Sequence, residues 1–236
     1  MIRALLLNAF IFMFTIILCA FAILISVFDR NGKWIHSLIE VPWARVILRL
    51  SGIKVNAVGL ENISAAKPLI FMSNHQSYFD IFTLFAFLPV NFKFIMKQEL
   101  MKIPFFGFTM KRAAHIGIER NNPRKAVMSM NRAVRRINSG TSVLIFPEGT
   151  RSIDGRLLSF KRGGFSLALK SGCDIVPVAI RGSYRIVLKG SLKINKGCID
   201  MFIGEPISVK EYTRKNVSQL MEKVREAMLR YLEDGS

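Results

Sequence analysis

A histidine and an aspartate five residues apart could form an acid–base pair in this chain. His75 and Asp80 lie between an apolar run at 68–72, typical of a buried strand, and an apolar run at 81–88, typical of a helix. A histidine whose second ring nitrogen is held by a carboxylate is suited to act as a general base near neutral pH. The spacing therefore predicts that His75 is the base and that Asp80 orients it. The structural alternative is that Asp80 caps the helix and His75 is a polar loop residue.

Another apolar run, at 143–146, is also typical of a buried strand and leads into a second polar loop. This loop favours the chemical interpretation of His75 and Asp80. The two stretches are Asn74-His75-x-Ser77-x-x-Asp80 and Phe146-Pro147-Glu148-Gly149-Thr150-Arg151. In this order and at this separation they resemble the two signature blocks of the glycerolipid acyltransferase family, whose best-known members are the 1-acylglycerol-3-phosphate acyltransferases. The resemblance covers roughly residues 50–205.

The second block provides groups suited to holding a phosphate. Arginine has a planar fork of donors that matches phosphate oxygens, and glycine lets the backbone approach a ligand closely. The resemblance implies that Arg151 binds the substrate phosphate and that Glu148 holds the site together, with Gly149 and Thr150 contributing to binding. For Glu148, the structural alternative is an ion pair with a neighbouring lysine or arginine.

Two more cations follow expected strands. In the family, a lysine after the strand at 92–96 meets the glycerol phosphate, and Lys97 matches it better than the alternative, Lys93. Arg120 ends a stretch similar to the family's middle block, which implies a phosphate contact. This stretch has Glu119 where an aspartate or another residue is often seen, so Arg120 could instead pair with Glu119 or Asp154.

Three other features keep a structural interpretation open. His115 is expected to be structural rather than a second base. The segment 103–107 either adjoins an acyl-chain groove or belongs to the core. The segment 160–165 could be an anion-binding loop at a helix N-terminus, although its two glycines are a weak signal.

The N-terminus contains an almost unbroken apolar run from Ala4 to Phe28. At about 1.5 Å per residue, such a helix could cross a hydrocarbon core of roughly 30 Å. We expect a retained membrane anchor rather than a cleaved signal peptide, for which Ala20-Phe21-Ala22 would be a weak cleavage site. An amphipathic segment at 34–53 follows, with Arg45 and Arg49 one turn apart, and could lie in the membrane interface. The resemblance makes a two-helix hairpin in one leaflet plausible; the alternative is a single span followed by a surface helix.

The chain is strongly basic, with a net charge of +18 and a pI of about 10.3. Such a charge implies an anionic partner. We expect a membrane surface rather than nucleic acid, because the sequence lacks a helix-turn-helix signal, zinc-finger spacing or an aromatic RNA motif. Lys and Arg mostly follow the anchor, which predicts the cytoplasmic face of a membrane, the bacterial inner membrane by the resemblance. The odd, scattered cysteines, Cys19, Cys173 and Cys198, predict neither a disulfide framework nor a zinc site.

We expect the membrane anchor to comprise residues 1–53. Over residues 54–236, short apolar runs alternate with helical patterns, which predicts one α/β domain. The resemblance implies a mixed, mostly parallel sheet flanked by helices. Strands are expected at 54–58, 68–72, 92–96, 115–119, 141–146, 174–180 and 198–203. Helices are expected at 78–88, 99–111, 123–138, 161–171 and 216–232, the last starting with a capping box of Asn216 and Gln219.

The implied reaction is transfer of a fatty acyl group from acyl-CoA or acyl-carrier protein to the sn-2 hydroxyl of lysophosphatidate, which gives phosphatidate. No metal or cofactor is expected. Two alternatives stay open. The acceptor could be another lysolipid, such as a lyso-ornithine lipid, or glycerol 3-phosphate; or the chain could be a membrane-binding protein of the same fold without turnover. Acyl chain length, the choice of donor and the oligomeric state do not follow from the sequence.

Overall fold

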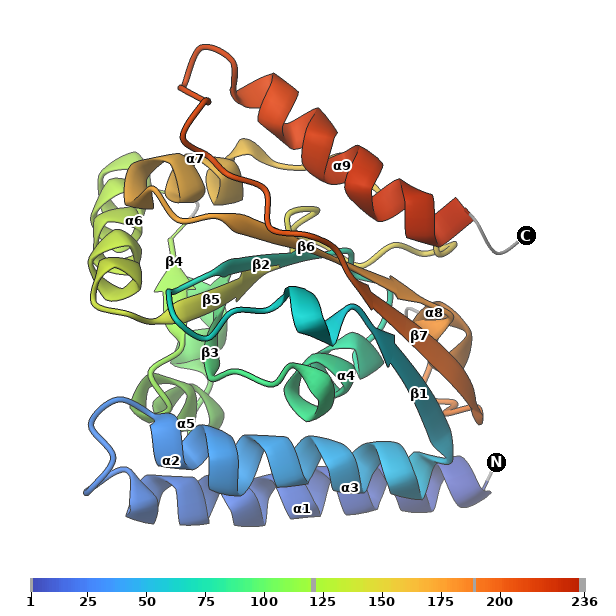
Figure 1. Ribbon diagram of the computed structural model, residues 1–236. Helices are drawn as coiled ribbons and strands as arrows, with labels where there is room; N and C mark the ends of the chain where they lie inside the picture. The colour runs from blue at the N-terminus through green and yellow to red at the C-terminus, as the bar shows by residue number, and fades with distance from the viewer. Residues whose placement is uncertain (1, 120–121, 189, 234–236) are drawn as a thin grey trace.

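The computed structural model describes residues 2–119, 122–188 and 190–233 and is built around a seven-stranded sheet with helices on both faces (Figure 1). The strands stand in the order β1-β7-β6-β2-β5-β3-β4. Their bounds are Ile53–Val58 (β1), Ile70–Ser73 (β2), Phe92–Lys97 (β3), Ile116–Ile118 (β4), Ser142–Ile145 (β5), Ile175–Arg181 (β6) and Gly197–Ile203 (β7). All seven expected strands are therefore present, with ends that differ by at most two residues.

The sheet is mixed and mostly parallel, as expected. From β6 through β2, β5 and β3 to β4, each strand runs parallel to its neighbour, whereas β7 pairs antiparallel with β6 and parallel with β1. The carboxyl ends of the five parallel strands consequently lie along one edge. In open α/β sheets such an edge is the usual place for a ligand site.

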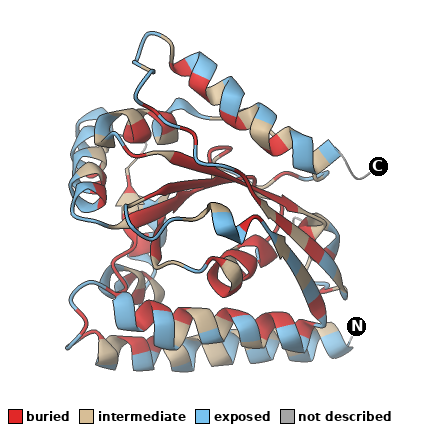
Figure 2. Cartoon of the chain, viewed as in Figure 1, coloured by how far each residue is buried: buried red, intermediate tan, exposed pale blue. Residues whose placement is uncertain are grey.

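Both faces of the central strands β2, β5 and β6 are buried (Figure 2), and the side chains that alternate along each strand reach two separate cores. In the segment that includes β2, Leu69 and Phe71 join the core under α3 (Val41–Ser51) and α4 (Phe79–Phe87). Ile70 and Met72 join the core under α6 (Pro123–Asn138), α7 (Arg162–Ser171) and α9 (Val217–Glu233). Burial of one such large side chain stabilises the fold by about 1.5–3 kcal/mol.

The helix expected at 99–111 is wrong as a single element. It is divided into a 3-10 turn, η3 (Gln98–Lys102), and α5 (Phe106–Arg112). Pro104 accounts for the break, because the residue before a proline favours extended backbone and Ile103 has φ −62° and ψ 122°. Phe105 then takes a positive φ of 64°.

Two further details differ at the ends of helices. The short α8 (Ser183–Ile186) was not expected from the pattern. At the start of α9, the Asn216 side chain accepts hydrogen bonds from the backbone N–H and hydroxyl of Thr213. It thus fixes the preceding turn and does not form the expected capping box. A short 3-10 turn, η2 (Leu60–Asn62), follows β1.

The N-terminal region forms a helical hairpin (residues 2–51), which lies along one side of the domain in Figure 1. Its first arm is α1 (Ile2–Ile25). The second arm consists of α2 (Lys33–Ile35), a π-helical turn η1 (His36–Glu40) and α3. Most of α1 is exposed although its mean hydropathy reaches 2.6, and by length and composition alone it could cross a membrane.

Hydrogen bonds at two positions of α1 hold it against the second arm of the hairpin. Arg3 donates to the Ser51 carbonyl at 2.9 Å, and the Trp43 indole N–H donates to the Thr15 hydroxyl at 3.0 Å. Arg45 turns toward α4 and donates to the Ala86 carbonyl. The geometry therefore agrees with paired helices better than with an α1 that projects away from the domain.

Candidate active site

His75, in the loop after β2, forms a hydrogen-bonded pair with Asp80, in the first turn of α4. The imidazole Nδ1 lies 2.8 Å from Oδ2 of Asp80, whose side chain is fully buried. Because an ionised carboxylate only accepts hydrogen bonds, the ring proton belongs on Nδ1 and Nε2 keeps its lone pair. Among the described residues no group bonds to Nε2. The ring is thus oriented as a base requires.

Asp80 also organises the loop itself. Oδ2 accepts the backbone N–H groups of Gln76 at 2.7 Å and Ser77 at 2.8 Å, in addition to the His75 ring. Asp80 is therefore wrong as a helix cap, because it lies inside α4, whose N-cap residue is Tyr78, and the backbone N–H groups that it accepts belong to the loop before the helix. Its other oxygen, Oδ1, is buried without a hydrogen-bond partner among the residues that the structure describes. Three N–H donors on one oxygen stabilise a charge that burial alone would disfavour.

The second signature block holds His75 from the other side. The backbone N–H of His75 donates to Oε1 of Glu148 at 2.6 Å, and its carbonyl accepts the N–H of Ser152 at 2.8 Å. The Phe146 ring stacks on the imidazole with centroids 3.9 Å apart and planes 13° apart. Residues from the ends of two neighbouring parallel strands, β2 and β5, thus fix the backbone and the ring plane of His75.

Glu148 acts as a buried clamp between loops. Its two oxygens accept the backbone N–H groups of His75 and Leu158, the latter at 2.8 Å. The alternative, an ion pair with a lysine or arginine, is not formed within the described ranges. Burial raises the pKa of Glu148 to about 7, and repulsion by Asp80 adds to this, although the two N–H bonds act in the opposite direction.

This raised pKa predicts a pH-dependent contribution to stability. Between pH 4.5 and about 7 the folded state binds this proton more tightly than the unfolded state, so the contribution of Glu148 to the free energy of unfolding falls as pH rises through this window. The neutral Glu148→Gln variant lacks that slope, and its NH₂ group also faces a backbone N–H, which costs about 1–3 kcal/mol.

The measurement is thermal unfolding of both proteins from pH 5 to pH 8. The advantage of the wild type over Glu148→Gln should be largest at pH 5, shrink toward pH 7 and then level off. A difference in melting temperature that stays constant over the whole range would contradict the assignment.

The predicted cations are placed unevenly. The Arg151 guanidinium lies over the Tyr78 ring, 3.8 Å from its centroid, just before α4. Lys97 is exposed and ends β3, on the same sheet edge, and Thr150 is exposed in the loop after β5. Arg120 lies outside the described residues. The structure thus brings Arg151 next to the loop of His75 and places Lys97 along the same edge without a direct contact to it.

Lys93 is wrong as an alternative phosphate ligand. Only 1% of its surface is exposed, and its ammonium donates to the Gly32 carbonyl at 2.6 Å. His115 is structural, as expected: its ring bonds to Glu40 and to the backbone of β3. In the segment 103–107, Ile103 and Phe105 are nearly half exposed, so for these two residues the core interpretation is wrong.

Several residues that position the site were not assigned from the sequence. The buried Asn74 amide forms two hydrogen bonds of 2.7 Å with the backbone of Ile180 in β6, which fixes the loop after β2. Phe146 and Tyr78 provide the aromatic surfaces for His75 and Arg151. The positions of Asn74 and Phe146, each within a signature block, were the available signals, whereas the contact of Tyr78 with Arg151 had none.

Lys161 is a further cation beside the second block. Gly149 has a positive φ of 71°, and a Cβ at this position would lie 3.1–3.2 Å from the Lys161 side chain, including its ammonium nitrogen. The backbone N–H of Lys161 is fixed by the Pro147 carbonyl at 2.8 Å. The lysine side chain therefore crosses the loop where the glycine leaves room for it.

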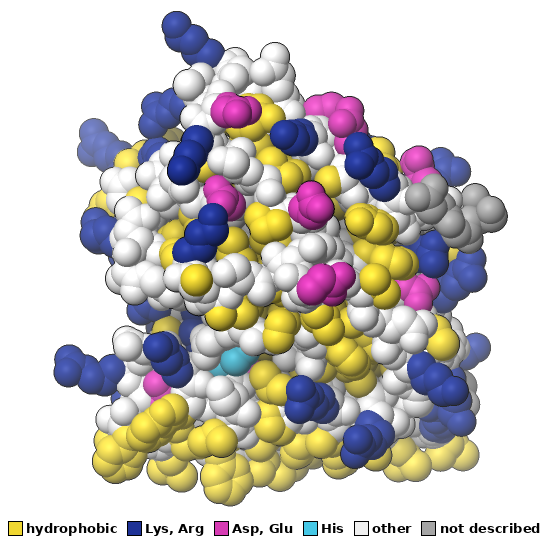
Figure 3. All heavy atoms as spheres, in the orientation of Figure 1, with side chains coloured by type: hydrophobic (Ala, Val, Ile, Leu, Met, Phe, Trp, Pro, Cys, Tyr) yellow, Lys and Arg dark blue, Asp and Glu magenta, His cyan; other side chains and the backbone are white. Residues whose placement is uncertain are grey.

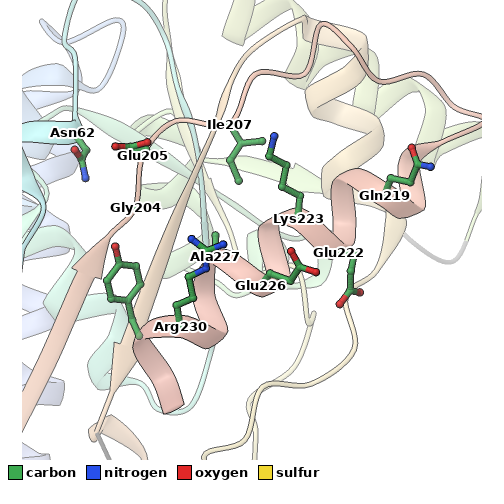
Figure 4. A pocket seen from close by; sticks show the side chains of 11 residues that line it. Asn62, Gly204, Glu205, Ile207, Gln219, Glu222, Lys223, Glu226, Ala227 and Arg230 are labelled. Carbon is green, nitrogen blue, oxygen red and sulfur yellow. The ribbon is translucent and has the colours of Figure 1, made fainter. Parts of the chain in front are cut away.

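A separate surface groove lies between α9 and the chain after β7 (Figure 4). Its charged lining includes Glu205, Glu222, Glu226, Lys223 and Arg230, and none of the signature residues takes part. Among the described residues, no group of three or more His, Cys, Asp and Glu side chains could hold a metal ion. The pair of His75 and Asp80 is therefore the candidate centre.

The sequence matches a family model and several named proteins. A family model described as Acyltransferase matches residues 54–181. The chain is 39% identical over 185 residues to the chloroplastic 1-acyl-sn-glycerol-3-phosphate acyltransferase LPAT1 of Arabidopsis thaliana, which covers 78% of this chain and 51% of that protein. It is 31% identical to the 1-acyl-sn-glycerol-3-phosphate acyltransferase of Pseudomonas aeruginosa, over 77% of this chain and 71% of that one. The chain thus spans about half the length of the chloroplast relative.

The fold is also similar to a solved structure. The crystal structure of the 1-acyl-sn-glycerophosphate acyltransferase PlsC from Thermotoga maritima superposes with a TM-score of 0.84 at 28% sequence identity. The match covers 99% of this chain and 96% of the other. The likeness therefore includes the N-terminal helices as well as the sheet.

Proposed function

Because this chain belongs to the acyltransferase family, we propose that it transfers a fatty acyl group from a thioester donor, acyl-CoA or acyl-carrier protein, to the sn-2 hydroxyl of 1-acylglycerol 3-phosphate. The product is phosphatidate. The names of the relatives support this acceptor.

One observation carries the proposal: the 2.8 Å contact between Nδ1 of His75 and the buried carboxylate of Asp80. It leaves Nε2 as the basic nitrogen, and 15% of the histidine side chain is exposed to solvent. A substrate hydroxyl can therefore approach the ring from outside. A histidine held in this way is suited to proton transfer near neutral pH.

The proposed reaction is a direct transfer. Nε2 of His75 removes the proton of the acceptor hydroxyl while the hydroxyl oxygen attacks the thioester carbonyl, and Asp80 stabilises the imidazolium. The tetrahedral intermediate then expels the thiol sulfur, which takes the proton back from Nε2. The ester bond replaces the thioester bond, and the base returns to its starting state. No acyl-enzyme forms, because the acceptor itself is the nucleophile.

The acceptor phosphate would be held by the cations on the same edge of the sheet. Arg151 is fixed over Tyr78 beside the histidine loop, and Lys161 crosses Gly149 in the same block. Lys97 extends the positive edge at the end of β3. With the phosphate held, the sn-2 hydroxyl is confined near His75, and such orientation can supply much of the rate.

The N-terminal hairpin would keep the enzyme at the membrane that contains its acceptor and product. Figure 3 shows apolar side chains gathered along the side of the molecule that α1 and α3 form, with lysines and arginines above them. Exposed apolar residues of α1 include Leu5, Phe12, Ile17, Phe21 and Leu24. Because α1 lies along the domain, we propose that the hairpin inserts into one leaflet, on the cytoplasmic face. Each lysine or arginine near the membrane surface would gain about 1 kcal/mol from attraction to anionic lipids.

The phosphate assignment predicts the behaviour of Arg151→Ala. Loss of charge-assisted hydrogen bonds of about 1.5–3 kcal/mol should raise KM for lysophosphatidate roughly 10- to 150-fold. Activity toward a monoacylglycerol, which has no phosphate, should hardly change. The measurement is initial rate against acceptor concentration in mixed micelles for both acceptors.

Arg230→Ala is the matched control, because Arg230 is an exposed arginine on α9 in the groove of Figure 4, away from the signature blocks. It should keep wild-type KM values. If Arg151→Ala raised KM equally for lysophosphatidate and for the monoacylglycerol, a contact of Arg151 with the phosphate would be ruled out. If the wild type preferred another lysolipid or glycerol 3-phosphate, the acceptor would have to be reassigned within the family.

A further inference from the structure

A buried polar cluster joins the N-terminal hairpin to the sheet. We call it the hairpin joint; all its members are buried, and they are Asp29, His36, Glu40, Lys93 and His115. Three come from the hairpin, and two come from β3 and the residue before β4. The groups that the catalytic mechanism uses are all outside this cluster.

The joint closes the turn between the two arms of the hairpin. Both Asp29 oxygens accept backbone N–H groups, from Lys33 at 3.0 Å and Ile35 at 2.8 Å. The Lys93 ammonium, from β3, donates to the Gly32 carbonyl in the same turn. The turn is also packed tightly, because a Cβ on Gly32 would lie 2.2 Å from the Ala113 carbonyl oxygen. The hairpin therefore has a fixed seat on the domain.

Glu40 and His115 form the centre of the joint. His115 Nδ1 accepts the Phe94 backbone N–H at 2.9 Å, so the ring proton belongs on Nε2, which donates to Glu40 at 2.7 Å. The other Glu40 oxygen lies 3.1 Å from Nδ1 of His36. Burial alone would raise the pKa of Glu40, but His115, His36 and Lys93 outweigh it and hold this pKa below its usual range. Glu40 and His36 stand on a π-helical turn, a feature that is frequent at functional sites.

Aromatic contacts continue from the joint to the catalytic base. The Phe94 ring, on the residue whose N–H His115 holds, lies 5.9 Å from the Phe146 ring at an angle of 25°. Phe146 in turn stacks on the His75 imidazole at 3.9 Å. The path thus runs from Glu40 through His115, Phe94 and Phe146 to His75.

A buried ionic cluster is a poor means of gaining stability, since apolar residues of similar volume often stabilise a fold as well or better. Its hydrogen bonds do, however, fix geometry. We propose that Glu40 and His115 are positioning residues, which hold Phe94 and Phe146 so that His75 keeps its catalytic orientation when the hairpin is seated. The proposal rests on the proposed acyl transfer for its effect on rate, and on the structure alone for its effect on the His75 ring.

The first test reads the His75 ring without any substrate. The chain has three histidines, so a protein labelled at the histidine Cε1 position gives a small set of NMR signals that His75→Ala and His115→Leu assign. Because Phe146 lies against the imidazole, a shift in its position changes the ring-current shift of His75. His115→Leu should move or broaden the His75 signal, and His115→Gln, whose amide can both accept from Phe94 and donate to Glu40, should largely restore it.

The matched control is Val224→Ala on α9. Val224 is buried in the core on the other face of the sheet, so the substitution destabilises the fold without touching the path. It should leave the His75 signal at its wild-type position. An unmoved His75 signal in His115→Leu, or an equal shift in Val224→Ala, would overturn the proposal whether or not phosphatidate is formed.

The second test is kinetic and uses the full-length protein in mixed micelles. His115→Leu should lower kcat per folded molecule by about ten- to a hundredfold, the scale of a misplaced catalytic group, with KM for the acceptor within about twofold. His115→Gln should recover most of the loss. In a double-mutant cycle with Phe146→Leu the two losses should be less than additive, because both act through the same ring. Unchanged kcat in His115→Leu, or strict additivity, would refute the path.

Discussion

Replacement of His75 by alanine is expected to lower kcat about 10²- to 10⁴-fold, the range for loss of a positioned general base. The substitution removes the proposed general base but leaves Arg151 over Tyr78 and the hairpin in place. KM for lysophosphatidate and binding to anionic vesicles should therefore stay near their wild-type values. Rates are measured with purified protein in mixed micelles.

The control for folding is the melting temperature of each variant. It should stay near the wild-type value, because the hydrogen bonds of Asn74 and Glu148 hold the backbone around residue 75 and do not involve its ring. His75→Gln, which keeps polar atoms at the site but has no basic nitrogen, should be as inactive as His75→Ala. A variant of either kind that kept a tenth of wild-type kcat would show that the base lies elsewhere.

Asp80→Asn should produce a loss of kcat of similar size, on the order of 10²- to 10⁴-fold. Oδ2 of Asp80 accepts three N–H groups, from the His75 ring and from the backbone of Gln76 and Ser77. If the asparagine oxygen keeps these bonds, the imidazolium loses its counter-charge. If the NH₂ group takes that place, Nδ1 becomes an acceptor, the proton moves to Nε2, and the ring can no longer act as a base.

Asp174→Asn is the matched control for Asp80→Asn. Asp174 pairs with the exposed Lys67 at the beginning of β6, the opposite end from the catalytic edge. Its substitution should leave kcat within about twofold, because the ion pair lies at the end of the sheet away from His75. Equal losses in the two variants, or a fully active Asp80→Asn, would contradict the assigned role of Asp80.

Much of the fold could be predicted from the sequence because its signals are local. The central strands β2, β5 and β6 are short apolar runs, and on α9 the buried Val217, Leu220, Val224 and Met228 repeat at three and four residues. The spacing of His75 and Asp80 across a strand–helix junction likewise predicted a contact that the structure shows at 2.8 Å. Such patterns depend on residues close in the chain, so no knowledge of distant contacts was needed.

Other features depend on contacts between distant segments and gave no local signal. Lys93 alternates with apolar neighbours as a surface lysine would, yet it is buried because Gly32 offers a carbonyl to it. A glutamate next to several lysines and arginines in the sequence suggests an ion pair, but the partners of Glu148 are the backbone N–H groups of His75 and Leu158. The break at Pro104 is different, because the proline itself is a local signal against the single helix predicted at 99–111.

The most direct test of the proposed function is incubation of the detergent-purified protein with 1-oleoylglycerol 3-phosphate and a labelled acyl donor, either acyl-CoA or acyl-carrier protein. The lipid product is then identified. We expect labelled phosphatidate from the wild type with at least one donor, and almost none from His75→Ala. Absence of phosphatidate with both donors, from protein that is folded and binds vesicles, would contradict the proposed reaction.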